Sequence, residues 1–194
     1  MTTALVTLVI GLAATGYLAL LVLPGRRSPM GHVWPPDALD ALRAVEIWVV
    51  SVTAFGAAYL LAAMTAGALP LPGWLSAGAG GLLLGLGMLT ATVSAAALGL
   101  AQTSGAAGPL RTRGPYAISR HPQYLGHAIT LTGWLVWTGS LMALPLTLAF
   151  LAGLALAARA EDRWLAAAHG ADWHRYAGEV RALIGRRRRP GKTG

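Results

Sequence analysis

The sequence predicts an all-helical integral membrane protein, a bundle of five transmembrane helices with a cytosolic amphipathic helix at its C-terminal end. Only 11% of the 194 residues are charged and 55% are hydrophobic, whereas a soluble domain has about 25% charged residues. The apolar residues form long uninterrupted segments, and the basic residues lie between them. This composition excludes a water-soluble globule. The absence of cysteine excludes disulfides, thiolate metal sites and cysteine nucleophiles.

The first two helices are predicted from two apolar segments. Thr3–Pro24 contains no charged residue, and as a helix it covers about the thickness of the hydrocarbon core. No basic residue precedes it and it is long for a signal peptide, which favours a membrane span over cleavage. A polar connection follows, in which Asp37 or Asp40 is expected to cap the next helix. The second helix is expected within Val45–Leu69.

A third helix is predicted over Trp74–Ala101, after a turn formed by the sequence PLPG. This segment is rich in glycine, but no strand precedes it and its glycines do not fit the pattern GxGxxG of a nucleotide-binding loop. Small residues at Gly81 and Gly85 are expected instead to let two membrane helices approach closely.

The next apolar segment, Ala128–Ala158, is 31 residues long. One helix of that length would measure about 46 Å and exceed a single crossing. The segment is therefore expected to fold into a helical hairpin at Thr138–Ser140. The first arm is predicted to begin near Pro122, since proline favours the first helical position, and Pro145 is predicted to kink the second arm.

The C-terminal region predicts an amphipathic surface helix capped by Asp172. Its expected apolar face repeats at intervals of three and four residues. The residues of this face are Trp173, Tyr176, Ala177, Val180, Leu183 and Ile184.

The basic residues segregate to one side of the five predicted crossings. All 15 lie in the first connection, in the third connection or in the tail. The positive-inside rule therefore places the N-terminus outside and the C-terminus in the cytosol. The run Arg186–Arg189 is expected to meet anionic lipid head groups rather than nucleic acid.

Polar residues that could carry chemistry gather at the cytosolic edge. Arg120 and His121 precede the hairpin, and Glu161 and Asp162 follow it, so antiparallel arms would bring both pairs to the same end. Charged groups at membrane depth usually face a cavity or one another, although snorkelling at the interface is the alternative. His169 and His174 are five residues apart and no HExxH motif occurs, so no metal site is predicted.

The string GPYAISRHPQYLG, the later acidic pair and the sequence HGADWHRY resemble the C-terminal signature of the integral-membrane methyltransferases. That family includes isoprenylcysteine carboxyl methyltransferases and phospholipid methyltransferases. The resemblance covers about half of the chain. Aspartate at position 162 stands where the family commonly has a second glutamate, which favours Glu161 over Asp162 as a direct cofactor contact.

The resemblance implies an enzyme with a cytosolic pocket for S-adenosylmethionine and a hydrophobic or lipid-anchored methyl acceptor that enters from the bilayer. Arg120 and Glu161 are the residues expected to take part in catalysis. The residues expected to bind the cofactor are His121, Pro122, Tyr124, Glu161, Asp162 and Tyr176. The tail residues Gly170 and Trp173 also match the family pattern.

The types of residue present suit this cofactor. Glu161 could pair with its ammonium group, and Arg120 or His121 could hold its carboxylate. Tyr124, Trp164 or Tyr176 could flank the adenine or the sulfonium.

The expected organisation is one membrane domain over 1–194, in the bacterial inner membrane. Residues 1–101 would supply three transmembrane helices, and residues 102–194 the cofactor-binding connector, the hairpin and the basic tail. Two other functions remain open. One is a membrane sterol or isoprenoid reductase that uses a nicotinamide cofactor, and the other is a non-enzymatic membrane module, for which polar residues at mid-membrane would be expected.

Overall fold

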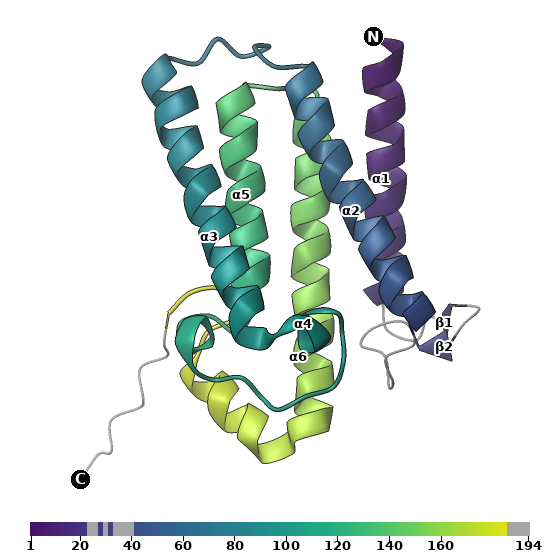
Figure 1. The fold of residues 1–194 in the computed structure, drawn as a ribbon, viewed down its shortest axis with the longest axis vertical. Helices are drawn as coiled ribbons and strands as arrows, with labels where there is room; N and C mark the ends of the chain where they lie inside the picture. The colour runs from purple at the N-terminus through teal and green to yellow at the C-terminus, as the bar shows by residue number, and fades with distance from the viewer. Residues whose placement is uncertain (23–26, 29–30, 33–40, 186–194) are drawn as a thin grey trace.

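The computed structural model describes residues 1–22, 27–28, 31–32 and 41–185. Within these ranges the chain is almost entirely helical, and its long helices stand together as a bundle (Figure 1). One short antiparallel pair joins strand β1 (Arg27–Ser28) to strand β2 (Gly31–His32). The helices are α1 (Thr2–Val22), α2 (Ala41–Met64), a π-helical segment (Trp74–Gly80) that continues into α3 (Gly81–Leu98), α4 (Leu100–Thr103), a 3-10 turn (Gly114–Ala117), α5 (Pro122–Thr138) and α6 (Leu144–Glu179).

Four described helices are long and apolar enough to cross a membrane. They are Thr2–Val22, Val45–Met64, Trp74–Leu98 and Leu144–Glu179. The helix α5 has 17 residues, about the shortest length that spans a bilayer. It packs along α3 inside the bundle (Figure 1). Each predicted apolar segment therefore corresponds to a helix of the bundle.

The predicted hairpin is present. α5 begins at Pro122 and ends at Thr138, and Gly139 follows in the left-handed conformation with φ 60°, which glycine adopts without steric cost. Pro145 lies in the first turn of α6, where its missing N–H leaves no hydrogen bond unmade. The predicted kink at Pro145 was therefore wrong, and the bend of α6 lies much later, at Gly170.

The predicted C-terminal helix is only partly present. The residues from Asp172 to Glu179 are helical, but they form the end of α6 after its bend. Val180 is extended, with φ −113° and ψ 134°, and the exposed Leu183 and Ile184 lie beyond the helix. Placing Val180, Leu183 and Ile184 on one helical face was therefore wrong. After Glu179 the backbone leaves the helix and forms hydrogen bonds with residues 118–121.

Helices α3 and α5 approach closely because glycines face each other between them. A Cβ atom on Gly126 would lie 2.5 Å from the backbone nitrogen of Ala91, and one on Gly87 would collide with the backbone of Thr130. Gly81 packs against the Trp137 ring, as expected of a contact glycine, but nothing lies within 4 Å of a Cβ on Gly85. The prediction for Gly85 was wrong because this residue points away from α5.

A second contact region joins α1, α2, α5 and α6. Leu61, Leu131 and Leu146 are almost completely buried there. The Trp134 indole donates a hydrogen bond of 3.0 Å to the carbonyl of Tyr59, and the two rings stack with centroids 5.2 Å apart. This packing fixes the hairpin of α5 and α6 against the first two helices.

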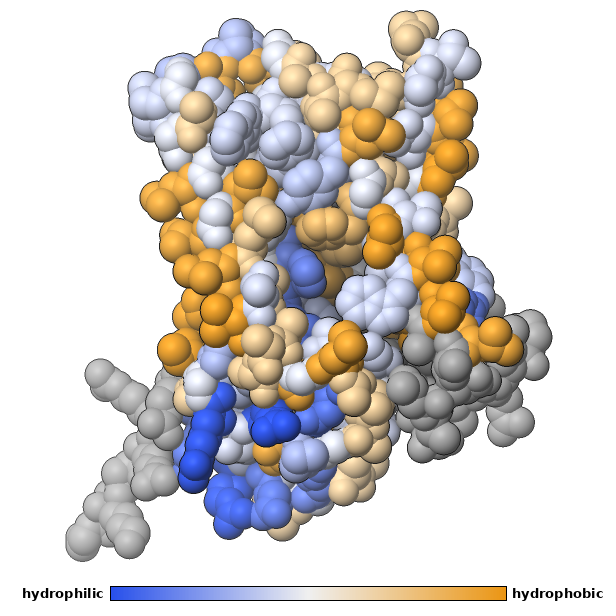
Figure 2. All heavy atoms as spheres, in the orientation of Figure 1, coloured by the Kyte–Doolittle hydropathy of each residue, from blue (hydrophilic) through white to orange (hydrophobic). Residues whose placement is uncertain are grey.

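The two ends of the bundle differ in polarity. At the end that holds the N-terminus, the connection 65–73 is joined to the end of α5 and the residue after it by hydrogen bonds from Gly67 to Thr138 and from Leu69 to Gly139, each 2.8 Å long. Hydrophilic side chains gather at the opposite end (Figure 2). The predicted caps Asp37 and Asp40 and the basic run 186–189 lie outside the described residues.

Replacing Gly87 by alanine is expected to lower the free energy of unfolding by about 1–3 kcal/mol, because the added methyl forces α3 away from α5. Thermal unfolding of the detergent-purified protein measures this change. Gly85→Ala is the matched control, two residues away on the same helix and in open space. It is expected to be neutral or to stabilise by up to about 1 kcal/mol. Equal unfolding temperatures for the two variants would contradict the close approach at Gly87.

Candidate functional site

The connection between α3 and α5 forms the floor of the site. After α4 the chain makes a 3-10 turn over Gly114–Ala117 and then delivers Ser119, Arg120 and His121 directly before the first turn of α5. Pro122, which begins α5, is buried. Proline at this position fixes the backbone in a helical φ, so the direction in which α5 leaves the connection is set next to His121.

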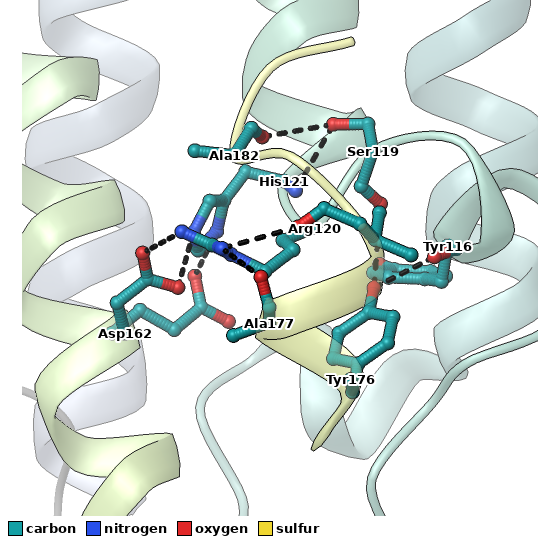
Figure 3. A network of polar contacts seen from close by, with 10 residues as sticks. Tyr116, Ser119, Arg120, His121, Asp162, Tyr176, Ala177 and Ala182 are labelled. Atoms are coloured by element: carbon teal, nitrogen blue, oxygen red, sulfur yellow. Dashed lines mark hydrogen bonds and ion pairs between the residues drawn. The ribbon is translucent and has the colours of Figure 1, made fainter. Parts of the chain in front are cut away.

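Two basic and two acidic side chains meet at this end of the bundle (Figure 3). An Nη atom of Arg120 lies 2.6 Å from one oxygen of Asp162, and Nε2 of His121 lies 2.9 Å from its other oxygen. Nδ1 of His121 lies 3.3 Å from the Glu161 carboxylate. Both oxygens of Asp162 and both nitrogens of His121 are thus engaged within the cluster. Four charged groups so arranged compensate one another's cost of burial.

The Arg120 guanidinium also binds the bent end of α6. It donates hydrogen bonds to the carbonyl oxygens of Ala177, at 3.4 Å, and Val180, at 3.2 Å. Its central carbon lies 5.6 Å from the centre of the Trp173 ring, within cation–π range. Arg120 therefore bridges Asp162 before the bend of α6 and the carbonyl groups after it.

Gly170 makes this geometry possible. Its backbone, with φ 52° and ψ −122°, is not helical and turns the last residues of α6 beneath the bundle (Figure 1). Side chains other than glycine avoid this conformation. The bend carries Trp173, Tyr176 and Ala177 back towards the connection before α5.

The segment after α6 accepts hydrogen bonds from the residues before α5 that carry the ion cluster. The backbone N–H of Arg120 donates to the carbonyl of Arg181 at 3.1 Å, and that of His121 donates to Ala182 at 3.3 Å. The Ser119 hydroxyl also donates to the Ala182 carbonyl, at 3.0 Å (Figure 3). These hydrogen bonds fix the backbone from which the Arg120 and His121 side chains project.

Three tyrosines surround the charged groups. The Tyr176 hydroxyl donates a hydrogen bond of 2.7 Å to the carbonyl of Tyr116 (Figure 3). Tyr116 is itself buried, which raises the pKa of its hydroxyl to about 12 and keeps it protonated at neutral pH. The Tyr124 ring stacks on the His121 ring, with centroids 5.6 Å apart and planes within 10°. The tyrosines thus form aromatic walls beside the ion pairs.

His121 is 3% exposed, and its surroundings change its protonation. Burial lowers the pKa of the imidazole, but the Asp162 and Glu161 carboxylates raise it by more, to about 9. His121 is therefore a cation at neutral pH. The cluster then contains two positive and two negative charges.

Hydrogen-bonding capacity remains at the site. In the part of the chain that the structure describes, Nε of Arg120 and Nε1 of Trp173 are buried and have no hydrogen-bond partner. Buried donors are normally paired, so two free donors beside one cluster suit a ligand that bears an acceptor such as a carboxylate. The Glu161 side chain is 27% exposed and can receive a cation. These groups, with the aromatic walls, fit the amino-acid end of S-adenosylmethionine.

All of the residues predicted for the site gather in this region. Arg120, His121, Glu161 and Asp162 are in direct contact with one another, Tyr124 stacks on His121, and Tyr176 contacts the same connection. Trp164, also considered for the aromatic wall, instead makes an edge contact with His169.

Several contacts of the site are not evident from the sequence motifs. The carbonyl groups of Ala177 and Val180 hold Arg120, Ser119 and Ala182 fix the connection, and Tyr116 accepts from Tyr176. A sequence motif does not reveal contacts made by backbone carbonyl groups. The sequence analysis identified Trp173 only as an aromatic residue of the tail that matches the family pattern. Its position over Arg120 depends on the bend at Gly170.

One comparison with known proteins gives a match. The family described as phospholipid methyltransferase matches residues 75–172, which is half of the chain and includes α3, α5, the Arg120–His121 pair and the acidic pair. No curated protein and no solved structure matches the chain.

Gly170→Ala is expected to lower the free energy of unfolding by about 1–3 kcal/mol, the cost of holding a side chain in this backbone conformation. Gly178→Ala is the matched control, since a Cβ at either position meets no atom within 4 Å and only Gly170 has a positive φ. Thermal unfolding in detergent compares the two. Indistinguishable variants would contradict the bend.

The His121 imidazole is expected to titrate near pH 9, well above its usual value of about 6.5. Because its pKa is raised on folding, its contribution to stability is complete below about pH 6.5 and is lost as pH rises through about 9. NMR titration of histidine-labelled protein, assigned with His121→Gln, measures the midpoint. A midpoint near 6.5 would refute the ion pairs. Thermal unfolding across this range should show a component absent from His121→Gln.

Proposed function

Because the chain belongs to the phospholipid methyltransferase family, we propose that it is an S-adenosylmethionine-dependent methyltransferase acting on a lipophilic acceptor. The observation that carries the proposal is the juxtaposition of the free donors of Arg120 and Trp173 with the accessible Glu161 carboxylate. The four membrane-length helices make this an integral membrane protein. We place it in the bacterial inner membrane.

The two acidic residues have different proposed roles. The two carboxylate oxygens of Asp162 contact Arg120 and His121. Asp162 would therefore act as a positioning residue. Glu161 lies 3.3 Å from the same imidazole and also interacts with the Tyr124 hydroxyl. Because its side chain is 27% exposed, it could still pair with the cofactor's ammonium group. This division agrees with the sequence argument, in which the shorter aspartate was the weaker candidate for direct contact.

The remaining site residues would bind and orient the cofactor. Nε of Arg120 and Nε1 of Trp173 are the donors proposed for its carboxylate. The Tyr124 and His121 rings, stacked on each other, offer a flat surface for the adenine. Pro122 fixes these side chains by starting α5, and Tyr176 holds the connection through its bonds to Tyr116 and Ser119.

The cofactor would supply an activated methyl group on a sulfonium. Displacement at that methyl requires alignment and exclusion of water more than acid–base groups. The buried ion pairs and the hydrogen-bonded segment after α6 are suited to that task. They close the polar end of the bundle without occupying the spare donors.

The proposed topology has five crossings, with α5 as the shortest. The described arginines belong to segments at the end opposite the N-terminus, so the positive-inside rule favours an external N-terminus and a cytosolic site. The basic tail over 186–192 would then lie at the cytosolic leaflet, where anionic head groups attract each basic residue by about 1 kcal/mol.

The proposal predicts that the detergent-purified protein binds S-adenosylhomocysteine, measured by isothermal titration calorimetry. Glu161→Gln should weaken binding by about tenfold or more, because a charge-assisted hydrogen bond is lost. Asp172→Asn is the matched control. This carboxylate lies on the same helix but is exposed and pairs only with Arg175 among the described residues. The affinity of Asp172→Asn for S-adenosylhomocysteine should equal that of the unmodified protein.

His121→Ala should also weaken binding, because it removes the centre of the ion cluster. Unchanged affinity in both Glu161→Gln and His121→Ala would overturn the site assignment. Binding of reduced nicotinamide dinucleotide in place of S-adenosylhomocysteine would favour the reductase alternative.

A further inference from the structure

A lipophilic cavity lies next to the charged cluster, within the bundle. Its volume is about 530 Å³, within the range of about 300–1,000 Å³ typical of small-molecule sites. It is lined by α1, α2, α3, α5 and α6 together with Thr103 of α4. A hollow between α2 and α3 is visible on the face shown in Figure 2. Trp48 and Val52, which line the cavity from α2, are 45% and 62% exposed, so the cavity opens sideways, where lipid surrounds the bundle.

The cavity adjoins the candidate site at Tyr124. This residue lines the cavity, stacks on His121 and interacts with the Glu161 carboxylate. His127 lies three residues further along α5 and also lines the cavity, about 4.5 Å along the helix axis from Tyr124. A molecule in the cavity can therefore extend from the lateral opening to the edge of the cluster.

No described residue that lines the cavity is Asp, Glu, Lys or Arg. A carboxylate, phosphate or ammonium group inside it would lack an opposite charge, and unpaired charges are costly to bury. The walls are mainly aliphatic and aromatic, including Leu18, Phe55 and Phe150. The cavity therefore favours an uncharged, largely apolar occupant.

Several polar side chains that line the cavity have no hydrogen bond to another described residue, and Thr15 and His127 are two of them. The Thr15 hydroxyl of α1 is buried without a hydrogen bond, and the residue is 4% exposed. His127 is contacted edge-on by the Phe55 ring, 5.4 Å between centroids, and no residue in the described ranges forms a hydrogen bond with its ring nitrogens. Leaving a buried hydroxyl such as that of Thr15 unpaired is unfavourable. A ligand with a group that donates and accepts hydrogen bonds could pair with Thr15 and with the His127 ring.

We propose that this cavity binds a neutral long-chain alcohol, whose hydroxyl is held by His127 and whose chain leaves through the opening between α2 and α3. The hydroxyl would donate to a ring nitrogen of His127, and it or a second oxygen on the chain would satisfy Thr15. This inference rests on the proposed function in one respect: the alcohol would be the methyl acceptor, with its hydroxyl presented towards Tyr124. The alcohol oxygen would form the new bond to the methyl carbon as the bond between that carbon and the cofactor's sulfur breaks, the hydroxyl proton would pass to the His127 ring nitrogen that it faces, and S-adenosylhomocysteine would leave. His127 would then bind the acceptor hydroxyl and accept its proton.

The test uses hexadecanol as the probe, without any methyl donor. Equilibrium binding of radiolabelled hexadecanol to the detergent-purified full chain should exceed that of hexadecanoic acid and hexadecylamine, which have the same chain length but carry charge. Photo-crosslinking with a diazirine analogue of hexadecanol should label peptides that line the cavity, which come from α1, α2, α3, α5 and α6. Stronger binding of the acid or the amine, or labelling confined to other parts of the chain, would overturn the proposal.

Variants of His127 and Thr15 test whether hexadecanol binding depends on hydrogen bonds to these residues or on the shape of the cavity alone. His127→Phe retains a ring and should weaken hexadecanol binding by about tenfold, while His127→Gln, which can still accept a hydrogen bond, should retain most of it. Thr15→Val should weaken binding by about threefold or more. The matched controls are His174→Phe and Thr132→Val, which alter exposed residues outside the cavity.

Equal hexadecanol affinity in His127→Phe and in the unmodified protein would overturn the role of His127. A folded variant is recognised by its unchanged S-adenosylhomocysteine affinity, since His127 makes no contact with the ion cluster among the described interactions. If the unmodified protein binds S-adenosylhomocysteine but not hexadecanol, this inference alone is refuted. If the unmodified protein does not bind S-adenosylhomocysteine, the proposed function is refuted.

Discussion

The ion pairs between the Arg120–His121 dipeptide and the carboxylates of Glu161 and Asp162 constrain the rest of the polar end of the bundle. They tie the start of α5 to the end of α6, the two arms of one hairpin. Each charge alone would be expensive to bury at the edge of a membrane. Together the four groups satisfy one another, and Arg120 extends this network to the carbonyls of Ala177 and Val180. These hydrogen bonds, together with those between residues 118–121 and residues 181–185, hold the segment after the bend of α6.

Close helix packing supports this polar end from the apolar side. The glycines between α3 and α5 let the two backbones approach without intervening side chains, which is a common basis for association of membrane helices. Because α5 starts at Pro122, directly after His121, the position of α5 against α3 also sets the position of the ion cluster. The exposed surface of the long helices remains apolar, as a surrounding lipid phase requires.

Two environments of different chemistry therefore meet at Tyr124. On one side lie four charged groups with spare donors, suited to a charged, water-soluble cofactor. On the other lies an uncharged cavity that opens between α2 and α3. A transfer reaction between a polar donor and a lipid acceptor requires both environments within a few ångströms, since the two reactants do not share a common phase. Tyr124 and His127, about one helical turn apart on α5, would meet this requirement for the proposed transfer.

The sequence by itself determined the helical spans, the hairpin turn at Gly139 and the residues of the ion cluster. Each depends on local signals: runs of apolar residues, a helix-terminating glycine, and a motif whose members adjoin in the chain. Gly85, Pro145 and the path after Glu179 were predicted wrongly, because the orientation of a helix face and the end of a helix depend on which partner segment packs against them. Only the tertiary structure decided how Trp173 reaches Arg120 and how His127 and Thr15 face one cavity. These groups come from helices far apart in sequence, and their meeting is set by packing and by the bend at Gly170.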